Sequence, residues 1–216
     1  TASRITSSND MARLSPFSIP TVSSMTASVS YADGASRDVT LDSRTTFAIV
    51  GSNNQSLIIL DTNSVSVDGG SSDYFSGMLD GFEVIVSFGG VSRTVSFSVV
   101  TLDHISLATA AFPVYYSSDG VQKSVINRLN CNSGSANVYQ RLHPVTEGFL
   151  SDSTSSGVDI TSYVDYVVAQ NASIVDLSGT VIAGMMAGQA RLSANWVNGN
   201  SSMSSFVDIT VDDSVV

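Results

Sequence analysis

Short segments in which apolar and polar residues alternate are the feature that most constrains this chain. Ala27, Val29 and Tyr31 alternate with polar residues. The same period of two recurs in later segments, at 65–67, 84–88, 91–99, 105–107, 164–168, 192–196 and 207–211. Such runs, rich in β-branched and aromatic residues, are typical of strands with one buried face.

Turn signals separate these segments. Asp33-Gly34, Gly89-Gly90 and Asn198-Gly199 each lie between two alternating runs, and such pairs favour tight hairpins because they tolerate positive φ. Residues 182–188 are apolar, but their two glycines favour a turn between strands over a helix. Many short strands with frequent turns predict an all-β fold of the sandwich type.

Composition limits the function. The chain of 216 residues is 43% hydrophobic and 13% charged, so it can bury a core. Its formal net charge of −10 disfavours nucleic acid as a partner, and its one lysine, Lys123, rules out a lysine cluster for anionic membranes. No apolar stretch reaches the roughly 18 residues of a membrane span.

The chain repeats part of its own pattern. The segment 29–34 is echoed at 114–120, and 37–40 is echoed at 158–161. We therefore expect two domains, repeat one at 18–101 and repeat two at 102–216. The spacing between the landmarks is longer in the second copy, which predicts an inserted segment at about 121–157. Residues 1–17 lack alternation and are expected to be a linker or the end of a preceding module.

The second copy resembles a known family. The segments that carry the resemblance are Asn-Ala-Ser-Ile-Val-Asp at 171–176, Ser-Gly-Thr-Val-Ile-Ala-Gly at 178–184 and Ala-Gly-Gln-Ala-Arg-Leu-Ser-Ala at 187–194. They resemble bacterial Ig-like repeats of group 2, the type found in invasin and intimin adhesins. The first copy matches at its opening, 31–40, and departs at 71–76. The resemblance implies tandem immunoglobulin-like β-sandwiches with a surface setting and no catalytic residues or cofactor.

Two kinds of modification are candidates. Asn54, Asn171 and Asn200 begin Asn-x-Ser sequons and are candidate glycosylation sites if the protein enters a eukaryotic secretory pathway. Cys131 is the single cysteine and lies in the predicted insertion. Burial as a small thiol is the favoured interpretation, and a cross-link to another chain is the alternative.

Catalytic and metal-binding residues are scarce. His104 and His143 are the only histidines, and neither lies near a Gly-x-Ser-x-Gly motif, so we expect no enzyme. The acidic residues Asp73, Asp80, Glu83, Asp208, Asp212 and Asp213 form no calcium-loop motif and are interpreted as surface charge. Trp196 and Tyr166 are expected in the core, with sugar stacking as the alternative.

These patterns predict an extracellular or cell-surface module, with a lumenal setting as the alternative. It would act as a structural or adhesion spacer, or as an assembly and contact unit of a larger protein. Its partners would be other proteins or copies of itself, and the segment 121–157 is the expected contact. The alternative function is a lectin-like module that binds calcium or glycans.

Overall fold

The computed structural model describes residues 3–6, 17–51, 55–68, 81–113, 122–129, 138–152, 156–198 and 201–215. Its regular elements are strands, joined in places by short 3₁₀ turns. The chain divides into two compact units: unit 1 is 1–102 with 150–154, and unit 2 is 103–149 with 155–216. The predicted fold class, all-β with tandem immunoglobulin-like β-sandwiches, is confirmed. The described residues include no helix long and apolar enough to cross a membrane.

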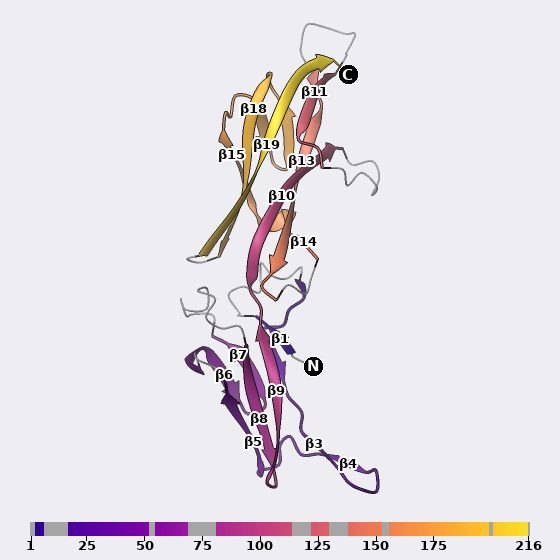
Figure 1. The fold of residues 1–216 in the computed structure, drawn as a ribbon, viewed down its shortest axis with the longest axis vertical. Coiled ribbons are helices and arrows are strands. Elements are labelled where there is room, and N and C mark those ends of the chain that lie inside the picture. The colour runs from indigo at the N-terminus through magenta and orange to yellow at the C-terminus, as the bar shows by residue number, and fades with distance from the viewer. Residues whose placement is uncertain are drawn as a thin grey trace. The chain divides into compact units, whose positions relative to one another are not determined.

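Unit 1 contains three sheets (Figure 1). The largest has the order β1 (Ser3–Ile5), β9 (Val91–Val99), β8 (Gly81–Phe88) and β5 (Thr45–Val50). A second has the order β2 (Val22–Ser24), β7 (Ser64–Val67) and β6 (Ile58–Asp61). The third is the hairpin of β3 (Ser28–Ser30) and β4 (Ser36–Asp38).

The β8–β9 hairpin organises the core of unit 1. Gly89 and Gly90 have φ of 57° and 83°, which a two-residue hairpin turn requires and which glycine adopts without strain. The resulting register sets Phe82 opposite Phe97, and the two rings stack at 5.1 Å between centroids. The buried core around them also contains Ile5, Met25, Leu57, Ile58, Val65, Val67, Val84 and Val99.

Strand β1 lies within residues 1–17, where a linker or the end of a preceding module is predicted. Residues 3–5 pair in parallel with Phe97–Val99, and Ile5 is fully buried in the core of unit 1. A three-residue strand with one inward apolar side chain is too short to show a period of two, so the sequence carried no visible signal. The other domain boundaries stay predictions.

Unit 2 contains two sheets (Figure 1). One has the order β10 (Leu102–Phe112), β13 (Arg141–Leu150), β17 (Val181–Gly184) and β16 (Val175–Ser178), with β14 (Val158–Asp159) paired to β13. The other has the order β12 (Val138–Tyr139), β11 (Val125–Leu129), β19 (Ser201–Val215), β18 (Gly188–Asn198) and β15 (Asp165–Gln170).

Strands β18 and β19 form the longest pairing in unit 2. It runs from Gly188 opposite Val211 to Asn198 opposite Ser201. Alternation along β18 buries one set of side chains: Ala190, Leu192, Ala194 and Trp196. Strand β11 pairs in parallel with the other side of β19.

The segment that resembles the bacterial repeat shapes one edge of unit 2. Strand β17 ends at Gly184 and β18 begins at Gly188, so the turn predicted at 182–188 is confirmed. Gly188 has φ of 147°, and a Cβ there would lie 2.7 Å from Cδ1 of Ile174. The backbone conformation at this position therefore favours glycine, and any larger residue would also have to displace the end of the Ile174 side chain.

The segment 121–157 contains strands β11, β12 and β13, all paired within unit 2. Burial alternates along β13, but the inward residues between Leu142 and Leu150 are Pro144, Thr146 and Gly148. These residue types hide the period of two, which is why the segment reads as an insertion in the sequence.

Removing the Ile5 side chain should test the role of β1. Ile5→Ala leaves a cavity in the core, and we expect the free energy of unfolding to fall by about 2–5 kcal/mol. Urea denaturation followed by circular dichroism measures this change. The control Leu41→Ala removes a side chain that is 82% exposed and should change stability by less than about 0.5 kcal/mol. Equal effects of the two variants would contradict the placement of β1.

Candidate functional site

Of the candidate modification sites, only Asn171 lies within the described residues. It has φ of 57° and is exposed, and its Nδ2 atom donates a hydrogen bond of 2.8 Å to the carbonyl of Gln189. This hydrogen bond uses one hydrogen of Nδ2, the atom that a glycan would modify, and it holds the turn before β16. Asn54, Asn200 and Cys131 lie outside the described residues, and their predicted roles stay predictions.

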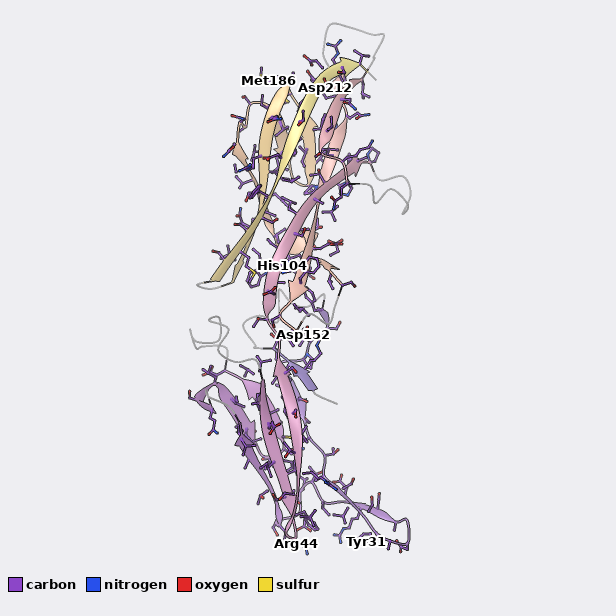
Figure 2. The ribbon with its side chains drawn as sticks, viewed as in Figure 1. Tyr31, Arg44, His104, Asp152, Met186 and Asp212 are labelled. Atoms are coloured by element: carbon purple, nitrogen blue, oxygen red, sulfur yellow. The ribbon has the colours of Figure 1, made fainter. Side chains whose placement is uncertain are left out.

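Both histidines make local contacts. His104, labelled in Figure 2, lies 2.8 Å through Nδ1 from the carboxylate of Asp103 and stacks on the ring of Phe149. His143 is half-buried and donates from Nδ1 to the carbonyl of Ala111 at 3.1 Å. Each imidazole therefore uses its Nδ1 atom in a contact with another residue of unit 2.

The three acidic residues near the C-terminus have separate partners. Asp208 binds Arg191 in two hydrogen bonds of 2.7 and 3.0 Å, and this guanidinium holds the pKa of the carboxyl below its usual value. Asp212 accepts from the backbone and hydroxyl of Ser214. Within the described ranges no three metal-ligating side chains converge, and Asp73 and Asp80 lie outside those ranges.

Asp213 accepts a hydrogen bond of 2.5 Å from the Tyr139 hydroxyl. The bond raises the pKa of the tyrosine, because ionisation would place a second negative charge beside the carboxylate. Asp213 therefore links the end of β19 to β12, which is a structural role.

Of the two aromatic residues expected in the core, Trp196 is confirmed there, with 3% of its surface exposed. It therefore offers no exposed face of the kind that sugar stacking needs. Tyr166 is half-buried, and its hydroxyl contacts Oγ1 of Thr146 at 2.8 Å and donates to the carbonyl of Thr161 at 3.2 Å. Burial raises the pKa of Tyr166.

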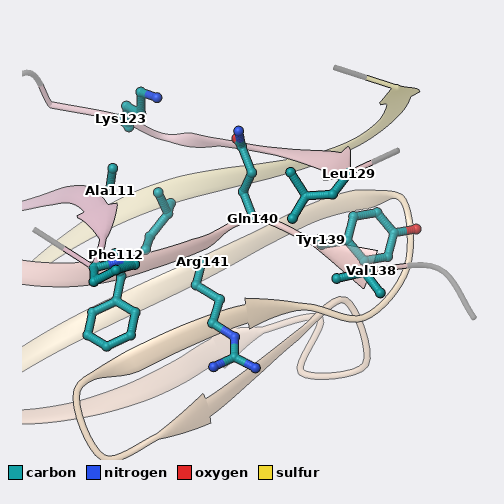
Figure 3. A pocket seen from close by; sticks show the side chains of 10 residues that line it. Ala111, Phe112, Lys123, Leu129, Val138, Tyr139, Gln140 and Arg141 are labelled. Carbon is teal, nitrogen blue, oxygen red and sulfur yellow. The ribbon is translucent and has the colours of Figure 1, made fainter. Parts of the chain in front are cut away.

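The candidate functional site is a groove of about 460 Å³ in unit 2, which we call the unit 2 groove (Figure 3). It lies between the end of β10, strands β11 and β12, and the start of β13. Phe112, Leu129 and Val138 line it and are partly exposed, at 39, 37 and 42%. A groove of this size with apolar walls is typical of a binding site.

Two cations line the same groove. Lys123 and Arg141 are exposed, and neither makes an ion pair with any residue that the structure describes. Exposed cations beside apolar walls favour a partner surface that combines carboxylates with aliphatic groups.

Backbone contacts hold these walls in place. The N–H of Lys123 donates to the carbonyl of Thr109, and the Thr109 hydroxyl donates back to the carbonyl of Lys123. The N–H of Gln140 donates to the carbonyl of Asn127 at 2.9 Å. Lys123 and Arg141 both lie in the segment 121–157, which the sequence predicted to make a contact.

No protein-family model matches this chain and no curated protein does, so membership of the bacterial Ig-like group 2 family stays a prediction. Solved structures with similarity include domains 4 and 5 of the S-layer protein SbsC, at 13% identity and TM-score 0.42 over 88% of this chain and 81% of that one. Extracellular repeats EC1-2 of human protocadherin-24 show 15% identity and TM-score 0.31, over 83% and 86%. Likeness at this level carries no argument about function.

The Arg191–Asp208 pair should make unit 2 sensitive to acid. The pKa of Asp208 is lower in the folded chain than in the unfolded one, so the pair stabilises the fold above about pH 4 and is lost as pH falls through the folded pKa. We expect Asp208→Asn to lower the melting temperature at pH 7 and to make its fall below pH 5 shallower. Melting curves across pH 2–7 measure this.

The matched control is Asp176→Asn, which removes an exposed carboxylate of β16 that makes no ion pair with the described residues. Its melting temperature should follow that of the original chain at each pH. If Asp208→Asn did the same, the acid response would arise elsewhere.

Proposed function

We propose that this chain is a structural or adhesion module of an extracellular or cell-surface protein, serving as a spacer and contact unit. The observation that carries the proposal is the unit 2 groove, in which Lys123 and Arg141 border apolar walls on a chain of net charge −10. The role is non-catalytic. In support, neither His104 nor His143 lies near a Gly-x-Ser-x-Gly motif in the sequence.

The proposed partner of the unit 2 groove is a second copy of this chain. Most of its surface charge is acidic, so a copy presents carboxylates to the two cations. Phe112, Leu129 and Val138 supply apolar area at the same place. A groove on one copy that receives a different surface of the next makes a head-to-tail contact, which continues into chains or rings of copies.

Sedimentation velocity over a range of protein concentrations tests this proposal. We expect concentration-dependent association that weakens as salt rises, because the contact joins opposite charges. The double variant Lys123→Gln/Arg141→Gln should shift the association to about tenfold higher concentration.

The control Gln170→Glu/Gln189→Glu makes the same change in net charge at exposed positions outside the groove and should associate like the original chain. A chain that stays monomeric at all concentrations and salts would contradict the proposal. Under the alternative function, calorimetry with calcium or a glycan array would instead give saturable binding that the groove variants leave unchanged.

A further inference from the structure

A second groove lies in unit 1, at the place where its sandwich opens. Strand β2 pairs with β7, but β3, four residues further on, pairs only with β4 among the strands that the structure describes. In Figure 1 the β3–β4 hairpin diverges from β8 and β9. A groove of about 740 Å³ lies between β3 and the β8–β9 hairpin, and we call it the unit 1 groove.

The floor of this groove continues the core of unit 1. The register sets Val95 opposite Val84, Arg93 opposite Val86 and Val91 opposite Phe88. Opposed residues share a face of the sheet, so all six lie on the face that holds the stacked Phe82 and Phe97. Toward the turn this face is uncovered, and Val91 is 66% exposed.

Strand β9 also has an open edge beside the groove. On one side β8 pairs with Val91–Ser98, but on the other β1 pairs only with Phe97–Val99. Among the described residues, Val91–Ser96 thus has no strand on that side. Residues flanking a two-residue hairpin turn form a hydrogen-bonded pair, so Val91, Arg93 and Val95 bond to β8. Ser92 and Thr94 direct their N–H and C=O groups to the open side.

Two exposed arginines lie at or near the groove. Arg93 lines it from β9. Arg37 lies opposite Val29 in the β3–β4 register, and Val29 is one of the residues that line the groove. Neither makes an ion pair with any residue in the described ranges. Arg44 and Tyr31 mark this end of unit 1 in Figure 2, and the Arg44 guanidinium lies 4.8 Å from the centre of the Phe88 ring.

The nearby carboxylates make hydrogen bonds to residues close to them in the sequence. Asp42 binds Arg44 in two hydrogen bonds of 2.9 and 2.7 Å. Asp33 accepts from the N–H of Ala35, and Asp38 accepts from the N–H of Thr40. Arg37 and Arg93 therefore remain available to carboxylates from outside.

We propose that the unit 1 groove binds an extended peptide strand with the pattern aliphatic–x–acidic–x–aliphatic, added to the open edge of β9. The strand would bond to the backbone of Ser92 and Thr94. Its alternate side chains would face Val91, Arg93 and Val95 in turn, which requires an acidic residue between two aliphatic ones. This site is separate from the unit 2 groove, and the inference does not rest on the function proposed there.

Fluorescence polarisation with a labelled, blocked peptide of sequence Ser-Val-Thr-Glu-Thr-Val-Ser tests the inference. We expect saturable binding that weakens about tenfold or more when the glutamate is replaced by lysine, and similarly for the variant Arg93→Glu. Nitrogen-15 NMR spectra should show the largest shifts at Ser92 and Thr94. The control Lys123→Glu alters the unit 2 groove and should bind the peptide like the original chain.

Thr94→Pro supplies an independent variant. It removes an N–H from the open edge while leaving the β8 pairing, and circular dichroism checks that unit 1 stays folded. Binding equal to that of the original chain in both Arg93→Glu and Thr94→Pro would overturn the inference, as would no binding at millimolar peptide. Self-association of the chain would also overturn the inference if Arg93→Glu abolished it and the peptide did not displace it. A second copy of the chain would then be the occupant of the groove.

Discussion

The pairing register of β18 with β19 determines which side chains unit 2 can bury. Because successive residues of a strand face opposite ways, a slip of one residue would turn Leu192, Ala194 and Trp196 out of the core together. This register starts at Gly188, whose φ of 147° favours glycine. In the same sheet, β15 pairs with β18 and β11 pairs with β19, so both take their positions from these two strands.

The two grooves arise for different reasons. In unit 2 the groove lies where the ends of β10, β11 and β12 meet the start of β13. In unit 1 it lies where β3 leaves the sandwich while the apolar face of β8 and β9 continues. Both grooves combine apolar floors with exposed cations, although the chain as a whole is acidic. Charge is thus distributed unevenly: the carboxylates Asp42, Asp208 and Asp213 serve the fold, and three cations, Lys123, Arg141 and Arg93, line the grooves.

Alternation of apolar residues predicted the strands at 84–88, 91–99, 192–196 and 207–211, because these strands bury aliphatic or aromatic side chains on one face. It missed β13, whose inward positions include Pro144, Thr146 and Gly148, and β1, which is only three residues long. Buried Thr146 is tolerated because Tyr166 and Thr161 satisfy its polar atoms.

The grooves were beyond prediction for another reason. The alternation around Val29 indicates a strand with one apolar face, but it is the same whether that face meets a closed core or an open groove. The outcome depends on whether β3 pairs only with β4 or also with a strand of the sandwich. That choice depends on contacts between residues far apart in the sequence. The approach of Lys123 to Arg141 across unit 2 is likewise a product of the tertiary fold.

Strand β19 lies between an antiparallel neighbour, β18, and a parallel one, β11, with Val125–Arg128 of β11 aligned along Thr210–Val215. A pull directed along β19 therefore acts at right angles to the hydrogen bonds on both of its sides and loads them at the same time. Strands arranged in this way cannot separate one bond after another, as a hairpin does when its ends are drawn apart. The last strand of unit 2 is thus placed to carry tension by shear, which is the demand that a surface spacer meets when its two ends are drawn in opposite directions.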